Sequence, residues 1–185
     1  MDDRDLISRV LAGETSAFKI LVERHQRLVA HIVARVVQQP EDREELCQDV
    51  FVRVYEKLDE FSFKSKLSTW IATIAYRHAI NHLRKQKMKW SELPEDDRWQ
   101  ERWGVTDTPA EVMEEAQMEE MVRHWIDQLP AQYRVVLTLY HLEHFDYREI
   151  GAATGMPEGT VKNYLFRARQ LLKEKVLLLQ RREDR

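Results

Sequence analysis

The chain has 185 residues, of which 43% are hydrophobic and 33% are charged, and it contains only five Gly and five Pro. This length fits one or two domains, and so few turn-forming residues predict an all-α protein with long helices. The single cysteine, Cys47, excludes an intramolecular disulfide and a cysteine-based zinc site within one chain. An acidic N-terminus without an apolar run of about 20 residues predicts a soluble, cytoplasmic protein with no membrane insertion.

The net charge of −3 is unevenly distributed along the chain. Residues 61–91 contain seven Lys and Arg and no acidic residue, and residues 159–173 also lack acids. Between them, residues 92–120 carry eleven acidic residues against two arginines. Nucleic-acid binders concentrate positive charge on the surface that meets phosphate. The two basic blocks therefore keep nucleic-acid binding open despite the negative total.

Apolar residues in the first half recur at helical spacing. A short helix is expected over Leu6–Leu11, and a longer one carries apolar residues from Phe18 to Val36 and is expected to end at Pro40. A second apolar run extends over Leu46–Phe61, with acids at its start that suit a helix N-terminus. A third helix is expected to begin at a cap residue, Ser68 or Thr69. These helices form one predicted module.

The second half begins after a charged segment, Trp90–Thr108, that lacks a sustained period and is expected to be a linker. Pro109 suits the first turn of a helix that stops at Pro130, and another helix is expected over Ala131–Glu143. The remainder, Tyr147–Lys175, is predicted to be two helices broken at residues 155–157.

The stretch YREIGAATGMPEGTVKNYLFRAR has the spacing of a helix-turn-helix. Ile150, Val161 and Leu165 would be buried, Gly151 would allow close approach of the second helix, and Gly155 would occupy the turn. The expected caps of the two helices are Asp146 and Thr160. The exposed face of the second helix offers donors and an apolar group suited to the major groove: Lys162, Asn163, Phe166, Arg167 and Arg169. The alternative is a pair of amphipathic helices with a solvated basic face.

The first basic block interleaves positive charge with aromatic residues: Phe61, Phe63, Trp70, Tyr76 and Trp90. Single-stranded nucleic acid is bound in this way, with cations along the backbone and rings under unstacked bases. Melted DNA is one expected ligand. In the alternative interpretation Trp70, which shares a helical register with Ile74, belongs to the core, as does Phe61.

These residues resemble the extracytoplasmic-function sigma factors of RNA polymerase. LPAQYRVVLTLYHLEHFDYREIGAATGMPEGTVKNYLFRARQLLKEKV is similar to sigma region 4, and the stretches AFKILVERHQRLV, EELCQDVFVRVYEKLDEF and LSTWIATIAYRHAINHLRK are similar to region 2. The resemblance implies two small helical domains, region 2 over 1–90 and region 4 over 111–185, joined by a flexible acidic linker over 91–110. It implies core RNA polymerase, promoter DNA and an anti-sigma factor as partners.

The resemblance also assigns roles by position. Core polymerase would be bound by Glu45, Gln48, Asp49, Val52 and Tyr55. The minus-10 element would be melted and read by Lys66, Trp70, Arg77, Asn81 and Arg84. The minus-35 element would be read by Lys162, Asn163, Phe166, Arg167 and Arg169.

One residue departs from the family pattern. Many members carry Asn where this chain has Arg77, and a guanidinium donates hydrogen bonds but accepts none. An Asn-like pocket for a flipped base is therefore not expected.

No catalytic residue, cofactor or metal site is predicted, because the sequence lacks a phosphate-binding glycine loop, a nucleophile elbow and a paired-carboxylate site. His78 and His82, four residues apart, have cationic neighbours and are expected to be exposed or DNA-facing.

Two rival functions fit parts of the sequence. A helix-turn-helix regulator with a sensing or dimerising N-terminal domain would bind a palindromic operator without polymerase. A protein-interaction adaptor would show no dependence on DNA. Copurification with core polymerase distinguishes a sigma factor from these two rivals.

Overall fold

The computed structural model describes residues 2–89 and 115–183, and all regular secondary structure in those residues is helical. The expectation of an all-α protein is confirmed. The N-terminal half contains α1 (Asp3–Leu11), α2 (Thr15–Val36), α3 (Pro40–Glu56), the 3₁₀ turn η1 (Leu58–Glu60) and α4 (Leu67–Lys89). The C-terminal half contains α6 (Glu115–Gln128), α7 (Ala131–His141), α8 (Tyr147–Thr154) and α9 (Glu158–Glu183).

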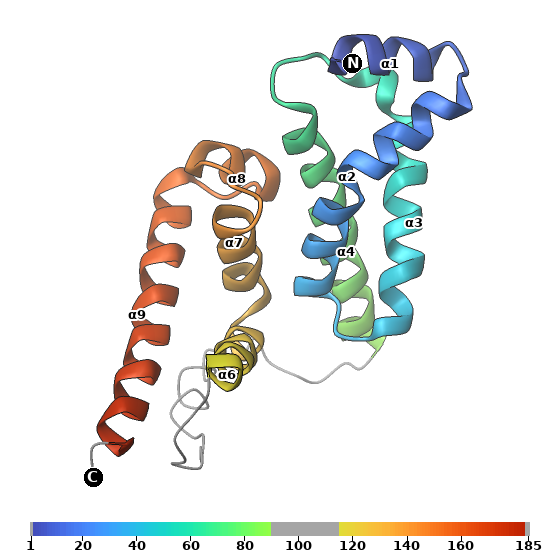
Figure 1. The fold of residues 1–185 in the computed structure, drawn as a ribbon. Coiled ribbons are helices and arrows are strands. Elements are labelled where there is room, and N and C mark those ends of the chain that lie inside the picture. Colours follow the sequence, from blue (N-terminus) through green and yellow to red (C-terminus); the bar gives the residue numbers. More distant parts are fainter. Residues whose placement is uncertain (1, 90–114, 184–185) are drawn as a thin grey trace.

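In the N-terminal half, α2 packs against α1, α3 and α4 (Figure 1). Its apolar stripe is fully enclosed, as expected from its spacing: Leu21, Val29, Ile32 and Val33 have no exposed surface. Phe61, for which a core role was one interpretation, is 7% exposed and belongs to this core.

Three helix boundaries differ from the prediction. Helix α1 starts at Asp3 instead of Leu6, because the Asp2 carboxylate accepts a hydrogen bond of 2.8 Å from the Asp5 amide and caps it. Helix α2 ends at Val36, and Pro40 lies in the first turn of α3, where its missing N–H costs no hydrogen bond. Helix α4 already includes Ser68 and Thr69, so neither residue is its cap.

In the C-terminal half, α7 ends at His141, two residues before the predicted end, and α9 continues past Lys175 to Glu183. The two predicted helices separated at residues 155–157 are confirmed as α8 and α9. A second core forms here around Trp125, Leu129, Leu139, Ile150 and Leu165, each at most 1% exposed. The predicted linker over 91–110, the helix start at Pro109, and Trp90, Trp99 and Trp103 lie outside the described residues.

The two halves contact one another through two pairs of helices. Helix α7 packs on α2, and α8 packs on α4, so that the C-terminal half lies alongside the N-terminal half (Figure 1). Within the described ranges, each helix is too short or too polar to cross a bilayer.

Candidate nucleic-acid interface

Helix α8 begins with a capping box. The Asp146 carboxylate accepts from the Glu149 amide at 2.7 Å, and the Glu149 carboxylate accepts from the Asp146 amide at 2.9 Å. Each side chain thereby satisfies an amide that has no partner within the helix. The predicted cap at Asp146 is confirmed, and its reciprocal partner Glu149 was not anticipated.

Two glycines shape the turn between α8 and α9. Gly155 has a φ of 76° and ends α8 in the left-handed conformation that side chains disfavour. A Cβ on Gly151 would lie 2.9 Å from the Met156 carbonyl oxygen. The close approach expected at Gly151 is therefore made by the turn itself.

Helix α9 divides into a buried and an exposed face. Val161, Leu165 and Ala168 are at most 1% exposed, as the spacing predicted for the first two. The other face exposes all five residues expected to meet DNA: Lys162, Asn163, Phe166, Arg167 and Arg169. Thr160 is not the cap, because α9 begins at Glu158 and the Thr160 amide donates to the Pro157 carbonyl.

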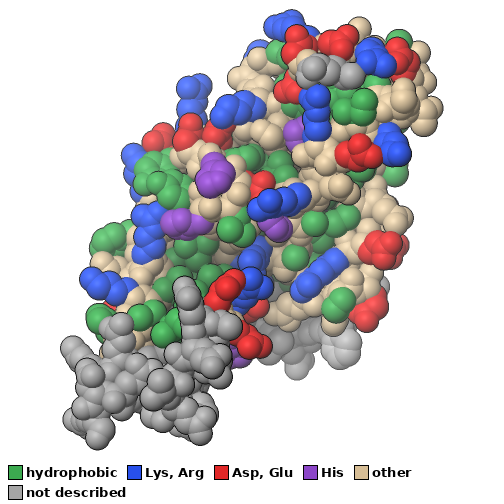
Figure 2. Space-filling model, in the orientation of Figure 1, with side chains coloured by type: hydrophobic (Ala, Val, Ile, Leu, Met, Phe, Trp, Pro, Cys, Tyr) green, Lys and Arg blue, Asp and Glu red, His purple; other side chains and the backbone are tan. Residues whose placement is uncertain are grey.

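Two of these cations lie over tyrosine rings. The Lys162 ammonium is 5.4 Å from the ring centre of Tyr147, and the Arg169 guanidinium is 5.0 Å from that of Tyr140. Such contacts orient a cation without neutralising it. The Lys162 ammonium also lies 3.3 Å from the Glu158 carboxylate on the same helix. The two tyrosines were missed by the sequence analysis because neither belongs to the recognition helix. Figure 2 shows basic side chains at the left margin of the molecule, beside α8 and α9.

Helix α4 carries the first basic block. Arg77, Asn81 and Arg84 are three and four residues apart and are all exposed on one face. Lys66 precedes the helix, and its ammonium lies 2.7 Å from the Glu149 carboxylate of α8, which raises the lysine pKa. The five residues assigned to the minus-10 element are thus not equivalent: three are exposed on α4, and Lys66 has an acidic partner in the other half.

The fifth residue, Trp70, is partly buried. Its ring lies 5.4 Å from that of Phe61 in a tilted arrangement, and Phe61 in turn lies 4.8 Å from Phe63. Phe63 is 39% exposed with a φ of 58°, and the Arg4 guanidinium lies 4.4 Å from its ring centre. Trp70 therefore packs against the core residue Phe61 and still keeps part of its ring accessible for stacking. Arg4 and its contact with Phe63 were not predicted.

Helix α3 presents a third surface. Glu45, Gln48, Asp49, Val52 and Tyr55, the residues assigned to polymerase binding, are all exposed along one face. Val52 and Tyr55, one turn apart, are 57% and 51% exposed and together form an apolar patch on this face. Cys47, on the same helix, is half-buried against the core, and burial raises the pKa of its thiol.

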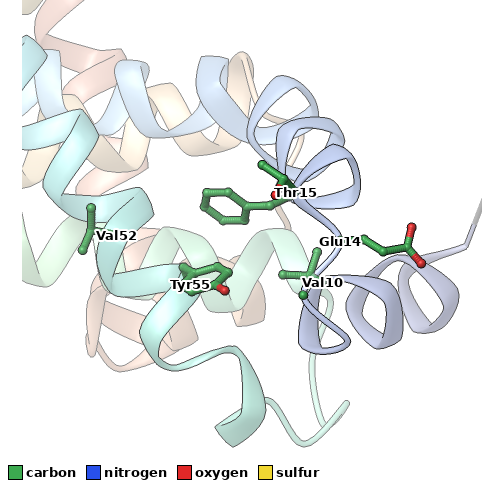
Figure 3. Close-up of a pocket in the computed structure, with 7 residues that line it drawn as sticks. Val10, Glu14, Thr15, Val52 and Tyr55 are labelled. Atoms are coloured by element: carbon green, nitrogen blue, oxygen red, sulfur yellow. The ribbon is translucent and has the colours of Figure 1, made fainter.

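An apolar groove lies beside Val52 and Tyr55 (Figure 3). Its volume is about 280 Å³, and its other wall is the turn between α1 and α2, including Val10, Thr15 and Phe18. The Phe18 and Tyr55 rings meet edge to face at 5.0 Å. The sequence analysis missed this second wall, because the short sequence of α1 gives no sign that Val10 lies near Val52 and Tyr55.

The sequence as a whole matches known transcription proteins. Residues 21–88 match the family model Sigma-70 region 2, and residues 119–172 match Sigma-70, region 4. The ECF RNA polymerase sigma-E factor of Escherichia coli strain K12 is 32% identical over 188 residues, which cover 98% of each chain. The factor of the same description from Haemophilus influenzae is 31% identical over 95% of this chain and 96% of its own.

The chain belongs to the ECF sigma factor family. It is therefore a transcription initiation factor that acts with RNA polymerase at specific promoters. The N-terminal half contains its region 2 and the C-terminal half its region 4, and α8 and α9 form the helix-turn-helix of region 4.

Solved structures share the fold. CnrH in complex with the cytosolic domain of CnrY matches with a TM-score of 0.65 and 21% identity over 94% of this chain and 96% of that one. The sigma factor RpoE from Bartonella quintana, crystallised with the anti-sigma factor NepR, matches with a TM-score of 0.63 and 22% identity over 85% and 94%.

Proposed function

We propose that three surfaces of this sigma factor divide the work of initiation. The exposed face of α3 binds core polymerase, the exposed face of α4 melts and reads the minus-10 element, and the exposed face of α9 reads the minus-35 element. The observation that carries this proposal is the accessibility of α9, whose five candidate residues all face solvent while Val161 and Leu165 anchor the helix. The division corresponds to region 2 over 1–90, a linker over 91–110 and region 4 over 111–185.

At the minus-35 element, Lys162, Asn163, Phe166, Arg167 and Arg169 supply the contacts. Arginine can donate two hydrogen bonds to guanine and lysine can donate to guanine or phosphate, whereas an exposed aromatic ring suits the thymine methyl group. Phe166 is 62% exposed, so its ring is available for such a contact.

At the minus-10 element, Lys66, Arg77, Asn81 and Arg84 hold the strand, and Trp70 provides an aromatic face at its edge. Arg77 acts on phosphate, because an Asn-like pocket for a flipped base requires a hydrogen-bond acceptor that the guanidinium lacks. Asn81, one turn along the same exposed face, has both a donor and an acceptor and is the base-reading residue.

The groove beside Val52 and Tyr55 binds an apolar ridge of core polymerase, and Glu45, Gln48 and Asp49, which precede Val52 on the exposed face of α3, supply polar contacts on one side of it. An apolar centre with a polar rim is typical of protein interfaces.

The acidic linker then passes through the polymerase as a nucleic-acid mimic and fixes the separation of the two DNA-reading helices, so that two weak contacts act as one strong one. A chain whose linker charges are scrambled would initiate normally if this role of the linker were wrong.

An anti-sigma factor is a further proposed partner. RpoE, which shares this fold, was solved with the anti-sigma factor NepR, and CnrH, which also shares it, was solved with the cytosolic domain of CnrY. We place the protein in the cytoplasm, where polymerase and chromosome are accessible, and we assign it no catalytic activity of its own.

Reconstitution with core polymerase tests the proposal. The purified chain plus core enzyme is expected to start RNA at specific sites of a genomic template, and Val52→Asp is expected to abolish copurification with core enzyme. Lys19→Ala, on α2 and exposed, is the matched control and should copurify normally. Binding to a palindromic operator without polymerase would contradict the proposal, as would equal copurification of the Val52→Asp chain.

A further inference from the structure

A row of three aromatic rings leads from α4 to the surface. The Trp70 ring lies 5.4 Å from that of Phe61, and the Phe61 ring lies 4.8 Å from that of Phe63. Phe61 is 7% exposed and belongs to the core, whereas Phe63 is 39% exposed. The row therefore ends in a ring that a ligand can reach from solvent.

The backbone holds Phe63 in an unfavourable conformation. Its φ of 58° lies in the left-handed region, which residues other than Gly avoid. Burial does not explain this conformation, because residues 62–66 are all exposed. Strained residues are concentrated at active sites and at places that clamp ligands. The strain indicates that the loop presents the Phe63 ring to a ligand.

Arg4 of α1 covers this ring. The central carbon of its guanidinium lies 4.4 Å from the centre of the Phe63 ring, and Arg4 is itself exposed. Helix α1 contacts η1 and lies across the end of the N-terminal half at which α4 begins (Figure 1). A cation over an exposed ring is held only weakly, so a planar group that stacks better can replace it.

The acidic residues beside Arg4 are directed elsewhere. Asp2 caps α1 with its carboxylate, and the Asp3 carboxylate lies 3.7 Å from the Arg24 guanidinium. Asp5 follows Arg4 in the sequence, but successive residues of a helix do not face one another. The positive charge of Arg4 is therefore available to an anion that approaches the Phe63 ring.

The face of α4 that is proposed to bind the minus-10 strand runs toward this aromatic row. Its residues are seven, four and three positions apart and so share one side of the helix: Trp70, Arg77, Asn81 and Arg84. A strand that follows this face reaches Trp70 near the start of α4, where the row continues to Phe63. Unstacked bases of any sequence stack on such rings, while cations hold the phosphates between them.

We propose that Phe63 and Arg4 bind one further nucleotide of the melted strand, beyond those that contact α4. The base stacks on the Phe63 ring and displaces the guanidinium, and Arg4 then binds the phosphate of the same nucleotide. This inference rests on the proposed role of α4 in binding the minus-10 strand. Without DNA, Arg4 keeps the exposed ring covered.

Promoter probes with an unpaired minus-10 strand test the stacking. Holoenzyme assembled from core polymerase and the full chain is titrated with the intact probe and with probes that carry one abasic site each. Phe63→Leu keeps an apolar side chain against Phe61 but has no ring, and it should bind the intact probe about 5- to 150-fold more weakly than wild type. Phe63→Tyr keeps the ring and should bind as wild type does. At one abasic position wild type should lose the same factor, and Phe63→Leu should lose nothing further.

The salt dependence of binding tests the phosphate contact. Arg4→Ala should reduce the slope of log affinity against log salt by about 0.7, the value for one phosphate of a single strand. Arg4→Lys keeps the charge and should keep the slope. Arg123→Ala is the matched control, because it removes an exposed arginine paired with Glu119 on α6, and it should leave the slope unchanged.

The outcomes separate this site from its alternatives. Wild-type affinity of the Phe63→Leu holoenzyme for the intact probe would overturn the proposal. An equal loss on a duplex that carries only the minus-35 element would also overturn it, because Phe63 would then support polymerase binding instead. If Arg84→Ala weakens binding and neither Phe63→Leu nor Arg4→Ala does, this inference fails while the role of α4 stands. The reverse result would support the nucleotide site and count against the role of α4.

Discussion

The guanidinium of Arg134 binds the carbonyl of Arg35 at 2.8 Å, and its other contacts explain why a cation is buried there. Arg134 also donates to the carbonyls of Asp127 and Leu129, each at 2.8 Å. Asp127 and Leu129 lie at the end of α6 and Arg35 at the end of α2, where helix carbonyls lack partners and the helix dipole is negative. Burial lowers the pKa of Arg134, and the three carbonyls compensate for its desolvation.

Arg134→Lys is expected to destabilise the protein by about 1–3 kcal/mol. A single ammonium cannot reach all three carbonyls as the guanidinium fork does, so the lysine would leave buried acceptors without a hydrogen bond. Urea unfolding followed by circular dichroism measures the change. Arg123→Lys, in an exposed pair with Glu119 on α6, is the control and should change stability by less than about 0.5 kcal/mol. Equal midpoints for both variants would contradict this role of Arg134.

Gly151 and Gly159 should respond oppositely to alanine. At Gly151 the added Cβ would lie 2.9 Å from the Met156 carbonyl, so the turn between α8 and α9 must shift, with an expected loss of about 1–3 kcal/mol. At Gly159 nothing lies within 4 Å, and alanine is the better helix former, so a gain of about 0.4–1 kcal/mol is expected. Thermal unfolding of the two variants compares them directly, and a stabilised Gly151→Ala chain would show that the turn adapts without cost.

Much of the fold follows from local sequence signals. The apolar stripe of α2, the turn at Gly155 and the cap at Asp146 depend on contacts within a few residues, and all three were predicted correctly. The boundaries at Pro40 and Thr160 were wrong, because proline and threonine are compatible with either side of a helix start. Spacing alone does not choose between these positions.

The contacts between regions could not be predicted from the sequence. Arg35 and Thr138 are 103 residues apart, and neither stands out in a helical pattern. The same holds for the groove wall formed by Val10 and Phe18, which depends on how α1 packs on α2 and η1. Exposure of the assigned residues on α9 followed from periodicity, because one buried face dictates the opposite one. The residues on α3 and α4 were assigned from the family resemblance, and Trp70 among them is partly buried. What each exposed residue binds remains a prediction.

His25 makes the stability of region 2 dependent on pH. Burial lowers its pKa from the ordinary value of 6.5, and its Nε2 is buried without a hydrogen-bond partner. The folded state therefore keeps the imidazole neutral, while the unfolded chain takes up a proton as the pH falls below 6.5. Stability is fully present above that pH and decreases as the pH falls toward the lower folded-state pKa.

Replacing His25 by Gln should flatten this dependence. Urea midpoints measured from about pH 8 to about pH 5 should fall less steeply for His25→Gln than for wild type. His78 and His141 also have pKa values lowered by burial and are present in both chains, so part of the acid sensitivity should persist. Identical slopes would show that His25 does not contribute.

Arg167→Ala distinguishes base reading from phosphate binding at the minus-35 element. Arg167 is exposed on α9, one turn after Asn163 on the same face. If it donates to a guanine edge, the substitution should weaken holoenzyme binding by about 1–3 kcal/mol on the preferred promoter and relax specificity at one base pair. Binding is measured against promoters with single base changes in the minus-35 element. A phosphate contact would instead weaken all promoters equally and reduce the salt dependence by about one counterion. Gln170→Ala, exposed on the next turn of α9, is the control and should bind each promoter as wild type does.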